Sequence, residues 1–186
     1  MYSKVGRVIG CGCGCYFFSI LASIVLSGCG LFGVLKTEER QELPVPLEIT
    51  LGAAERVNPN IEGRPSPIVV RLFELANDTR FLAADYFELM GQDGTPLGEE
   101  MLVSEEYILL PGEVRVVRKR AAPNGKFLGV VAGYRDLTSS AWRAIAPLPA
   151  PYLAGRVWTK SVSPTKRLYV VLGERGATIY EEQPGQ

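Results

Sequence analysis

The four cysteines of this chain, Cys11, Cys13, Cys15 and Cys29, fall within the first 29 of its 186 residues, and the sequence contains no histidine. The residues that follow Cys29 therefore have no disulfide and no Cys/His zinc site, and they lack the histidine base of Ser-His-Asp enzymes. Hydrophobic residues make up 47% of the chain. We expect a domain that is stabilised by its packed core, binds no metal and is not an enzyme.

The charges of the chain are balanced. It has 20 Lys and Arg residues and 20 Asp and Glu residues, so its formal net charge is zero. Proteins that bind nucleic acid present an excess of Lys and Arg to the phosphates. We therefore expect no nucleic acid partner.

Residues 1–28 have the layout of a secretory signal peptide. Lys4 and Arg7 precede an apolar run that extends from Ile9 to Leu26, an order typical of such leaders. An uncleaved transmembrane anchor is the alternative, because about 17 to 25 apolar residues span a bilayer. Glycines disfavour a continuous helix here, and they stand at Gly6, Gly10, Gly12, Gly14 and Gly28.

The leader ends in Leu26, Ser27, Gly28 and Cys29, which resembles the lipobox of bacterial lipoproteins. The resemblance implies that the Cys29 thiol receives diacylglycerol and that the new N-terminus receives an acyl chain. We expect no other cofactor. Gly30 stands where many inner-membrane lipoproteins carry aspartate. We therefore expect a lipid-anchored protein on the periplasmic face of the outer membrane.

A tether and one folded domain follow the leader. Residues 29–44 have mixed charges and little apolar periodicity, so we expect a lipidated N-terminus and a flexible tether. Residues 45–182 are predicted to form the domain. Leu47, Ile49 and Leu51 alternate with polar neighbours as in a half-buried strand, and residues 68–75 are rich in β-branched and aromatic residues, as in a buried one.

The same reasoning predicts short strands at residues 101–110, 114–119, 127–134, 157–160, 167–172 and 177–180. About eight short strands in about 140 residues indicate a mainly β fold, a sandwich of two sheets. Residues 81–88 suit one or two short helical turns, and residues 139–144 a further turn around Trp142. Gly129 and Gly133 predict a bulge or close packing in their strand.

Two clusters of charge have an ordinary structural interpretation. Adjacent glutamates in a strand point to opposite faces, so the acidic cluster at Glu99, Glu100, Glu105 and Glu106 is predicted to be solvated rather than catalytic or calcium-binding. Basic residues gather at Arg115, Arg118, Lys119 and Arg120. They suit either an edge strand protected by charge or a surface that meets a phosphate, a lipid headgroup or an acidic partner.

The loop at residues 54–67 is the best candidate for a recognition surface. It contains three prolines and a glycine, so it cannot extend either neighbouring strand far. A pre-shaped loop loses little conformational entropy when it docks. A plain connection between two strands is the alternative.

The sequence around this loop resembles the TssJ (SciN/VasD) lipoproteins of bacterial type VI secretion systems. The resemblance rests on the lipobox and on residues 51–60 and 63–75, and it continues at Phe81, Ala84, Asp85, Phe87, residues 110–112, 129–132 and 134–136, Trp142 and Arg143. It becomes weaker beyond residue 151.

The resemblance implies a transthyretin-like β-sandwich whose partner is the periplasmic C-terminal domain of the inner-membrane protein TssM, within a membrane complex that includes TssL. In the family, the loop between the first two strands is implicated in that contact. The corresponding candidate residues here are Glu55, Arg56, Asn58, Pro59, Asn60, Gly63, Arg64 and Pro65. The alternative is a lipoprotein that binds a small envelope ligand or glycan between its sheets or at Trp142, Tyr152 and Trp158.

Overall fold

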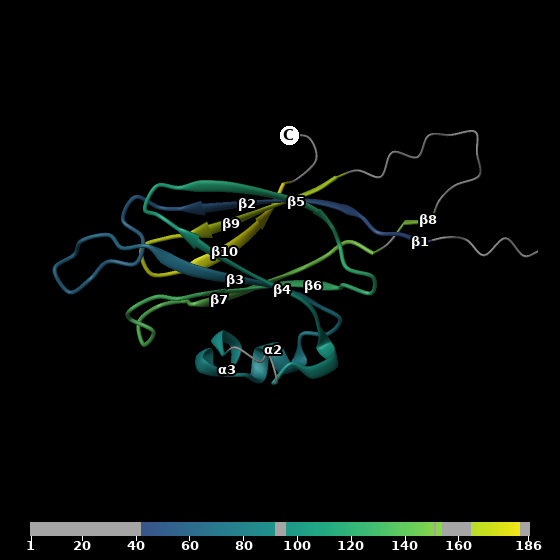
Figure 1. The fold of residues 1–186 in the computed structure, drawn as a ribbon, viewed down its shortest axis with the longest axis horizontal. Coiled ribbons are helices and arrows are strands. Elements are labelled where there is room, and N and C mark those ends of the chain that lie inside the picture. The colour runs from purple at the N-terminus through teal and green to yellow at the C-terminus, as the bar shows by residue number, and fades with distance from the viewer. Residues whose placement is uncertain (1–41, 92–95, 151, 154–164, 183–186) are drawn as a thin grey trace, which may run out of the picture. The chain divides into compact units, whose positions relative to one another are not determined.

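The computed structural model describes residues 42–91, 96–150, 152–153 and 165–182. Within them the chain forms two four-stranded β-sheets, a pair of two-residue strands and two short α-helices (Figure 1). The two sheets stack face to face, and both helices lie on the outer side of one of them. The predicted class, a mainly β sandwich of two sheets with a short added helical segment, is confirmed.

The sheet that contains β2, which we call the β2 sheet, has the strand order β10-β9-β2-β5. Strand β2 is antiparallel to β5 and parallel to β9. Its side chains alternate between buried and half-buried, as the period-two pattern predicts, because only one face of this sheet meets the core. The strands are β2 (Pro46–Ala53), β5 (Val114–Arg120), β9 (Lys166–Leu172) and β10 (Ala177–Glu181).

The second sheet, the β3 sheet, has the order β4-β3-β6-β7 and is antiparallel throughout. Both of its faces are covered, one by the β2 sheet and the other by the helices (Figure 1). This explains why β3 is apolar on both faces along much of its length. The strands are β3 (Ile68–Leu75), β4 (Met101–Leu109), β6 (Phe127–Ala132) and β7 (Arg143–Pro147).

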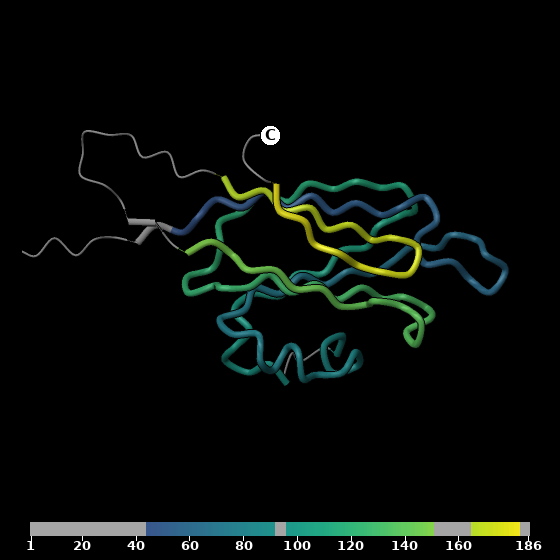
Figure 2. The backbone as a smooth tube through the Cα atoms, turned by 180° about the vertical axis from the view of Figure 1, so that it is seen from behind, coloured from purple at the N-terminus to yellow at the C-terminus, as the bar shows by residue number. Residues whose placement is uncertain are grey.

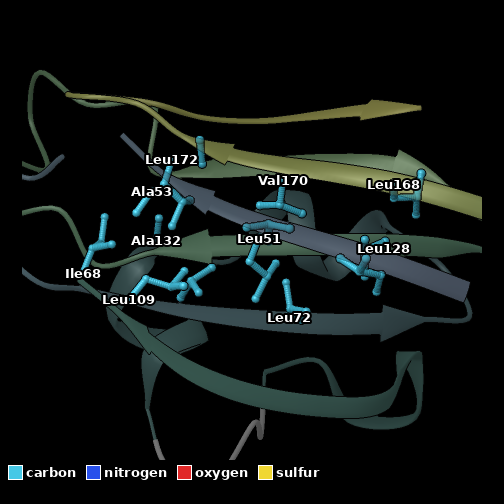
Figure 3. Close-up of a cluster of buried hydrophobic side chains, with 14 of the residues drawn as sticks. Leu51, Ala53, Ile68, Leu72, Leu109, Leu128, Ala132, Leu168, Val170 and Leu172 are labelled. Atoms are coloured by element: carbon cyan, nitrogen blue, oxygen red, sulfur yellow. The ribbon is translucent and has the colours of Figure 1, made fainter. Parts of the chain in front are cut away.

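Aliphatic side chains from both inner faces form the core between the sheets (Figure 3). Leu51 and Val170 of the β2 sheet meet Leu72 and Leu128 of the β3 sheet, and each of the four is at most 3% exposed. Complete burial of such a side chain contributes about 1.5–3 kcal/mol. This core stabilises the domain without any cysteine in the described residues.

The helices α2 (Thr79–Ala83) and α3 (Tyr86–Met90) confirm the predicted helical turns, and a single 3-10 turn follows at Gly98–Glu100. Asp85 caps α3, because its Oδ1 accepts a hydrogen bond from the Glu88 N–H while Glu88 Oε2 accepts one from the Asp85 N–H, both at 2.8 Å. None of the helices in the described part is long and apolar enough to cross a membrane.

Two arginines and a glycine attach the helices to the β3 sheet. Arg71 Nη1 of β3 donates to the carbonyl of Gly91 at 2.8 Å, and Arg143 Nη1 of β7 donates to the carbonyl of Ala84 at 3.0 Å. Each carbonyl belongs to the residue that directly follows a helix. Gly129 lies under α2, where an added Cβ would come within 2.7 Å of the Phe81 ring. The close packing predicted at Gly129 is therefore confirmed.

The helical turn predicted at residues 139–144 is wrong. Residues 143–147 form β7, in which Ala144 lies opposite Val130 of β6. A six-residue segment has little helical stability of its own, and the exposed edge of β6 supplies hydrogen-bond partners for a strand. The sequence pattern around Trp142 does not show that edge.

The end of the predicted tether also takes part in strand pairing. Strand β1 (Glu42–Leu43) pairs with β8 (Tyr152–Leu153), which lies far along the chain. No local pattern reveals such a long-range pair. The leader, residues 29–41 of the tether and the strand predicted at residues 157–160 lie outside the described residues.

Candidate functional site

Three of the connections between strands at one end of the sandwich surround a groove, and we call this end the loop end. They are residues 54–67 between β2 and β3, residues 133–142 between β6 and β7, and residues 173–176 between β9 and β10. Figure 2 shows all three at the same end of the tube, with residues 54–67 extending furthest. Strand β2 runs toward this end, so the chain enters the sandwich at the opposite end.

Asn58 anchors the loop at residues 54–67. Its φ is 48°, a left-handed conformation that Asn adopts more readily than most residues. Its Nδ2 donates to the Pro67 carbonyl at 2.9 Å, and its Oδ1 accepts a hydrogen bond from the Arg135 N–H at 2.8 Å. Asn58 is only 4% exposed. Its amide therefore joins two connections of the loop end and is not presented to a partner.

A second asparagine shapes the tip of the loop. Asn60 Oδ1 accepts hydrogen bonds from the N–H groups of Glu62 at 3.0 Å and Arg64 at 2.9 Å. Gly63 has a φ of 76°, which a residue with a side chain rarely adopts. This tight turn presents Ile61, whose side chain is fully exposed at 103%.

Arg56 of the loop at residues 54–67 and Tyr134 of the β6–β7 connection both contact the β9–β10 turn. Arg56 Nε lies 3.6 Å from Glu174 Oε2, and both side chains are solvent-accessible, so the ion pair contributes about 0–1 kcal/mol. The Tyr134 hydroxyl donates to the Gly173 carbonyl at 3.1 Å. Burial raises the pKa of Tyr134 well above its ordinary value of 10.0, which keeps this hydroxyl protonated.

A groove of about 620 Å³ separates the tip of the loop from the other two connections. Apolar atoms of Pro59 and Ile61 line one part of it, and charges of both signs line the rest. The charged residues are Arg135, Asp136, Glu174 and Arg175. Such a surface offers contacts to a polypeptide with polar and apolar groups. Among the described residues, no three side chains of the types that bind metals are grouped together.

The structure brings all eight candidate loop residues together at the loop end. Glu55, Arg56, Gly63, Arg64 and Pro65 are exposed, Pro59 and Asn60 are half-buried, and Asn58 is buried. The four lipobox residues Leu26, Ser27, Gly28 and Cys29 lie outside the described residues.

Ile61 is the residue that the sequence analysis missed. A single apolar residue between polar ones in a turn-forming segment is the signal that could have indicated it. The groove residues of the other connections, such as Arg135 and Glu174, could not be found from sequence, because only folding brings them to the loop.

Members of the acidic and basic clusters noted in the sequence form ion pairs within the domain. Glu105 and Glu106 point to opposite faces, as predicted, but both form ion pairs: Glu106 Oε2 lies 2.6 Å from Arg71 Nη2, and Glu105 Oε1 lies 2.7 Å from Lys119 Nζ. The interpretation of β5 as an edge strand is confirmed.

The sequence analysis named two places where a small ligand could bind, the space between the sheets and the aromatic residues around Trp142. Both are largely occupied by protein side chains in the described residues. Buried residues fill the space between the sheets. Trp142 packs at 5.5 Å, centroid to centroid, against Tyr86, and the Arg143 guanidinium lies 4.9 Å from its ring centroid. The side chains of Tyr152 and Trp158 lie outside the described residues.

Two solved structures that are similar to this chain are components of type VI secretion systems. The T6SS lipoprotein TssJ1 from Pseudomonas aeruginosa is 31% identical, with a TM-score of 0.67 over 77% of this chain and 100% of that chain. Serratia marcescens Lip, a membrane-bound component of the type VI secretion system, is 28% identical, with a TM-score of 0.64 over 76% of this chain and all of Lip.

A third structure shows the same fold at lower identity. It is described as the T6SS protein TssM C-terminal domain from EAEC, and the matching chain is 21% identical, with a TM-score of 0.55 over 74% of this chain and 98% of that one. No curated protein sequence matches.

The sequence profile of the family described as type VI secretion lipoprotein (VasD, EvfM, TssJ) matches residues 45–167. The matched region begins where the folded domain was predicted to begin, and it includes the whole loop at residues 54–67. It covers more than half of the chain. The chain therefore belongs to the TssJ (SciN/VasD) family of type VI secretion lipoproteins.

Proposed function

We propose that this chain is anchored to the outer membrane by lipid on Cys29 and that its loop end binds the periplasmic C-terminal domain of TssM. In this role it tethers the TssM–TssL membrane complex to the outer membrane without catalysing a reaction. Membership of the lipoprotein family supports the proposal. Further support is that the structure described as the TssM C-terminal domain includes a chain of this fold.

The observation that carries the proposal is the pre-shaped loop at residues 54–67. Asn58 anchors its base and Asn60 closes its tip through backbone hydrogen bonds. A loop that is ordered before binding loses little conformational entropy on docking. The eight residues of β2 separate the loop from the end at which the chain enters by about 27 Å. The proposed contact surface therefore lies at the end of the sandwich opposite to the one at which the chain enters.

Ile61 is the centre of the proposed contact. Its side chain is fully exposed, and the charged residues Glu62 and Arg64 stand beside it, with Arg64 Nε 3.7 Å from Glu62 Oε2. An apolar centre with a polar rim is the usual composition of a protein–protein interface. Burial of this isoleucine in a pocket of TssM would contribute about 1.5–3 kcal/mol.

The lipid anchor is tested with the Cys29→Ser variant of the full chain. We expect the variant to be lost from washed membranes that retain the wild type, because it lacks the thiol that receives the lipid. The melting temperature of the folded domain should not change, since Cys29 precedes it. A variant that stays in the membrane fraction would contradict the anchor.

The contact is tested with Ile61→Asp and, as a matched control, Ile108→Asp. Both replace an exposed isoleucine, which is 103% exposed at the loop tip and 58% exposed on β4. We expect Ile61→Asp to raise the Kd for the TssM C-terminal domain by about tenfold or more, equivalent to about 1.4 kcal/mol. Ile108→Asp should leave the Kd unchanged. Equal Kd values for all three proteins would exclude the loop tip from the contact.

A further inference from the structure

The outer face of the β2 sheet carries an apolar patch. Ten large hydrophobic side chains are exposed in the described part of the chain, and half of them lie on this one face. In Figure 1 both helices lie beyond the other sheet, so neither covers it. Exposed apolar residues concentrated on one face mark an interaction surface. The five are Val114, Val116, Tyr169, Val171 and Tyr180.

The strand pairing arranges this face in three rows that run from β10 across β9 and β2 to β5. One row alternates in charge, and its members form ion pairs: Arg118 Nε lies 2.7 Å from Glu48 Oε2, and Arg167 Nη1 lies 2.8 Å from Glu182 Oε2. The rows are Glu182-Arg167-Glu48-Arg118, Tyr180-Tyr169-Thr50-Val116 and Thr178-Val171-Gly52-Val114.

We propose that two copies of this chain associate through these faces around a two-fold axis. The axis lies between the two faces, is parallel to the strands, and passes over the midline between β9 and β2. This axis places β10 of one copy against β5 of the other, and β9 against β2. Every charge in the first row then meets an opposite charge. In the other rows Tyr169 meets the smaller Thr50, and Val171 meets Gly52, which has no side chain. The six facing pairs are Glu182 with Arg118, Arg167 with Glu48, Tyr180 with Val116, Tyr169 with Thr50, Val171 with Gly52, and Thr178 with Val114.

The charge pattern favours a second copy over a partner of another kind. A partner surface of one sign would meet a like charge at every second position of the row, and such contacts are unfavourable. Under the two-fold axis the alternation complements itself. Contact between identical patches is the commonest arrangement in soluble oligomers, and two β-sheets pack face to face with their strands nearly aligned.

The contact area sets the expected strength. Four strands about 4.8 Å apart and three rows about 6.8 Å apart cover about 400 Å² per copy, or about 800 Å² in total. This area lies in the range of weak, transient complexes. The dimer should therefore be reversible and depend on concentration.

A charge exchange tests the arrangement. Two versions of the full chain with different tags, Arg118→Glu and Glu182→Arg, are purified in detergent, separately and as a mixture. Alone, each variant sets like charges against each other across the contact, so its dimerisation should weaken by about tenfold or more. In the mixture every charge again meets its opposite, and sedimentation velocity and co-purification should show a mixed dimer. Arg64→Glu, at the loop tip, is the control and should dimerise like the wild type.

A steric variant supplies a second measurement. No atom lies within 4 Å of a Cβ built at Gly52, so Gly52→Leu should fold with an unchanged melting temperature. It should abolish the dimer, because the new side chain occupies the space that Val171 of the second copy requires. Adding Val171→Ala in the same chain should restore dimerisation in part.

A wild type that remains monomeric at every concentration tested would overturn the proposal, and it would indicate that another segment or partner uses the patch. Single charge variants that dimerise as strongly as the wild type, or a mixture that forms no mixed dimer, would also overturn it.

Discussion

Lys119 of β5 reaches across the sandwich to Glu74 of β3: its Nζ lies 2.6 Å from Oε1 of a glutamate that is 2% exposed. Because β5 and β3 belong to different sheets, this ion pair joins the two layers. Glu74 Oε2 also accepts a hydrogen bond from the Ala122 N–H at 2.6 Å, and Lys119 Nζ lies 2.7 Å from Glu105 Oε1. The network closes the end of the sandwich that is opposite the loop end.

Lys119→Met is expected to destabilise the domain by about 3–5 kcal/mol, because it leaves the buried Glu74 charge without its cation. Denaturant unfolding of the full chain measures the loss. Arg115→Met on the same strand, which breaks the solvent-accessible ion pair with Glu113, should cost about 0–1 kcal/mol. Replacing both charges, in Glu74→Leu/Lys119→Met, should recover most of the stability. A loss for Lys119→Met no larger than for Arg115→Met would contradict this role.

The same network predicts how stability depends on pH in acid. Burial opposes ionisation of Glu105, but hydrogen bonds from Lys119 and Tyr107 outweigh it and lower the pKa of Glu105 below its ordinary value of 4.5. Ionised Glu105 therefore stabilises the fold above about pH 4.5, and this stabilisation is lost as the pH falls through the lower pKa of the folded state. We expect Glu105→Gln to show a smaller loss of unfolding free energy than the wild type on acidification.

At alkaline pH the dependence is reversed, and the stability is expected to fall as the pH rises. Burial opposes the charge on Lys119, but hydrogen bonds to Glu105 and Glu74 outweigh it and raise the pKa of Lys119 above its ordinary value of 10.5. Its contribution is complete below about pH 10.5 and is lost as the pH rises through the pKa of the folded state. Melting temperatures of the wild type and Lys119→Met should therefore converge above that pKa. A constant difference across this range would refute the prediction.

Two glycines should respond differently to the same substitution. A Cβ at Gly129 would lie 2.7 Å from the Phe81 ring, whereas a Cβ at Gly52 would have no atom within 4 Å. We expect Gly129→Ala to cost about 1–3 kcal/mol through overpacking. Gly52→Ala should be neutral or slightly stabilising, because glycine is unfavourable within a strand. Chemical denaturation compares the two, and Phe81→Leu should relieve the loss at Gly129.

Asn58→Ala should loosen the whole loop at residues 54–67. It removes the hydrogen bonds to the Pro67 carbonyl and from the Arg135 N–H, which corresponds to a loss of about 1–3 kcal/mol. Hydrogen exchange at the Ser66 amide, which donates to the Val57 carbonyl at 3.2 Å, should become faster. Asn60→Ala should leave that amide protected, because it opens only the tip. Unchanged exchange in Asn58→Ala would show that the anchor is dispensable.

Local sequence patterns predicted those strands well whose conformation is determined by residues nearby in the chain. Strand β3 has the predicted bounds, and β9 begins one residue earlier than predicted. Strand β7 was missed because its hydrogen bonds come from β6 rather than from its own neighbours. The strands at residues 101–110 and 114–119 were predicted, but not that the turn between them connects two sheets, since β4 pairs with β3 and β5 pairs with β2.

The sequence by itself determined the mainly β class, the loop with three prolines and the resemblance to type VI lipoproteins, because alternation, proline and short motifs act over a few residues. Only the tertiary structure decided that Asn58 is buried while Ile61 is fully exposed. Both are single residues in one loop, and their roles differ because Asn58 meets the Arg135 backbone, which folding brings from another connection. The outer face of the β2 sheet likewise exists only after four distant segments pair in register.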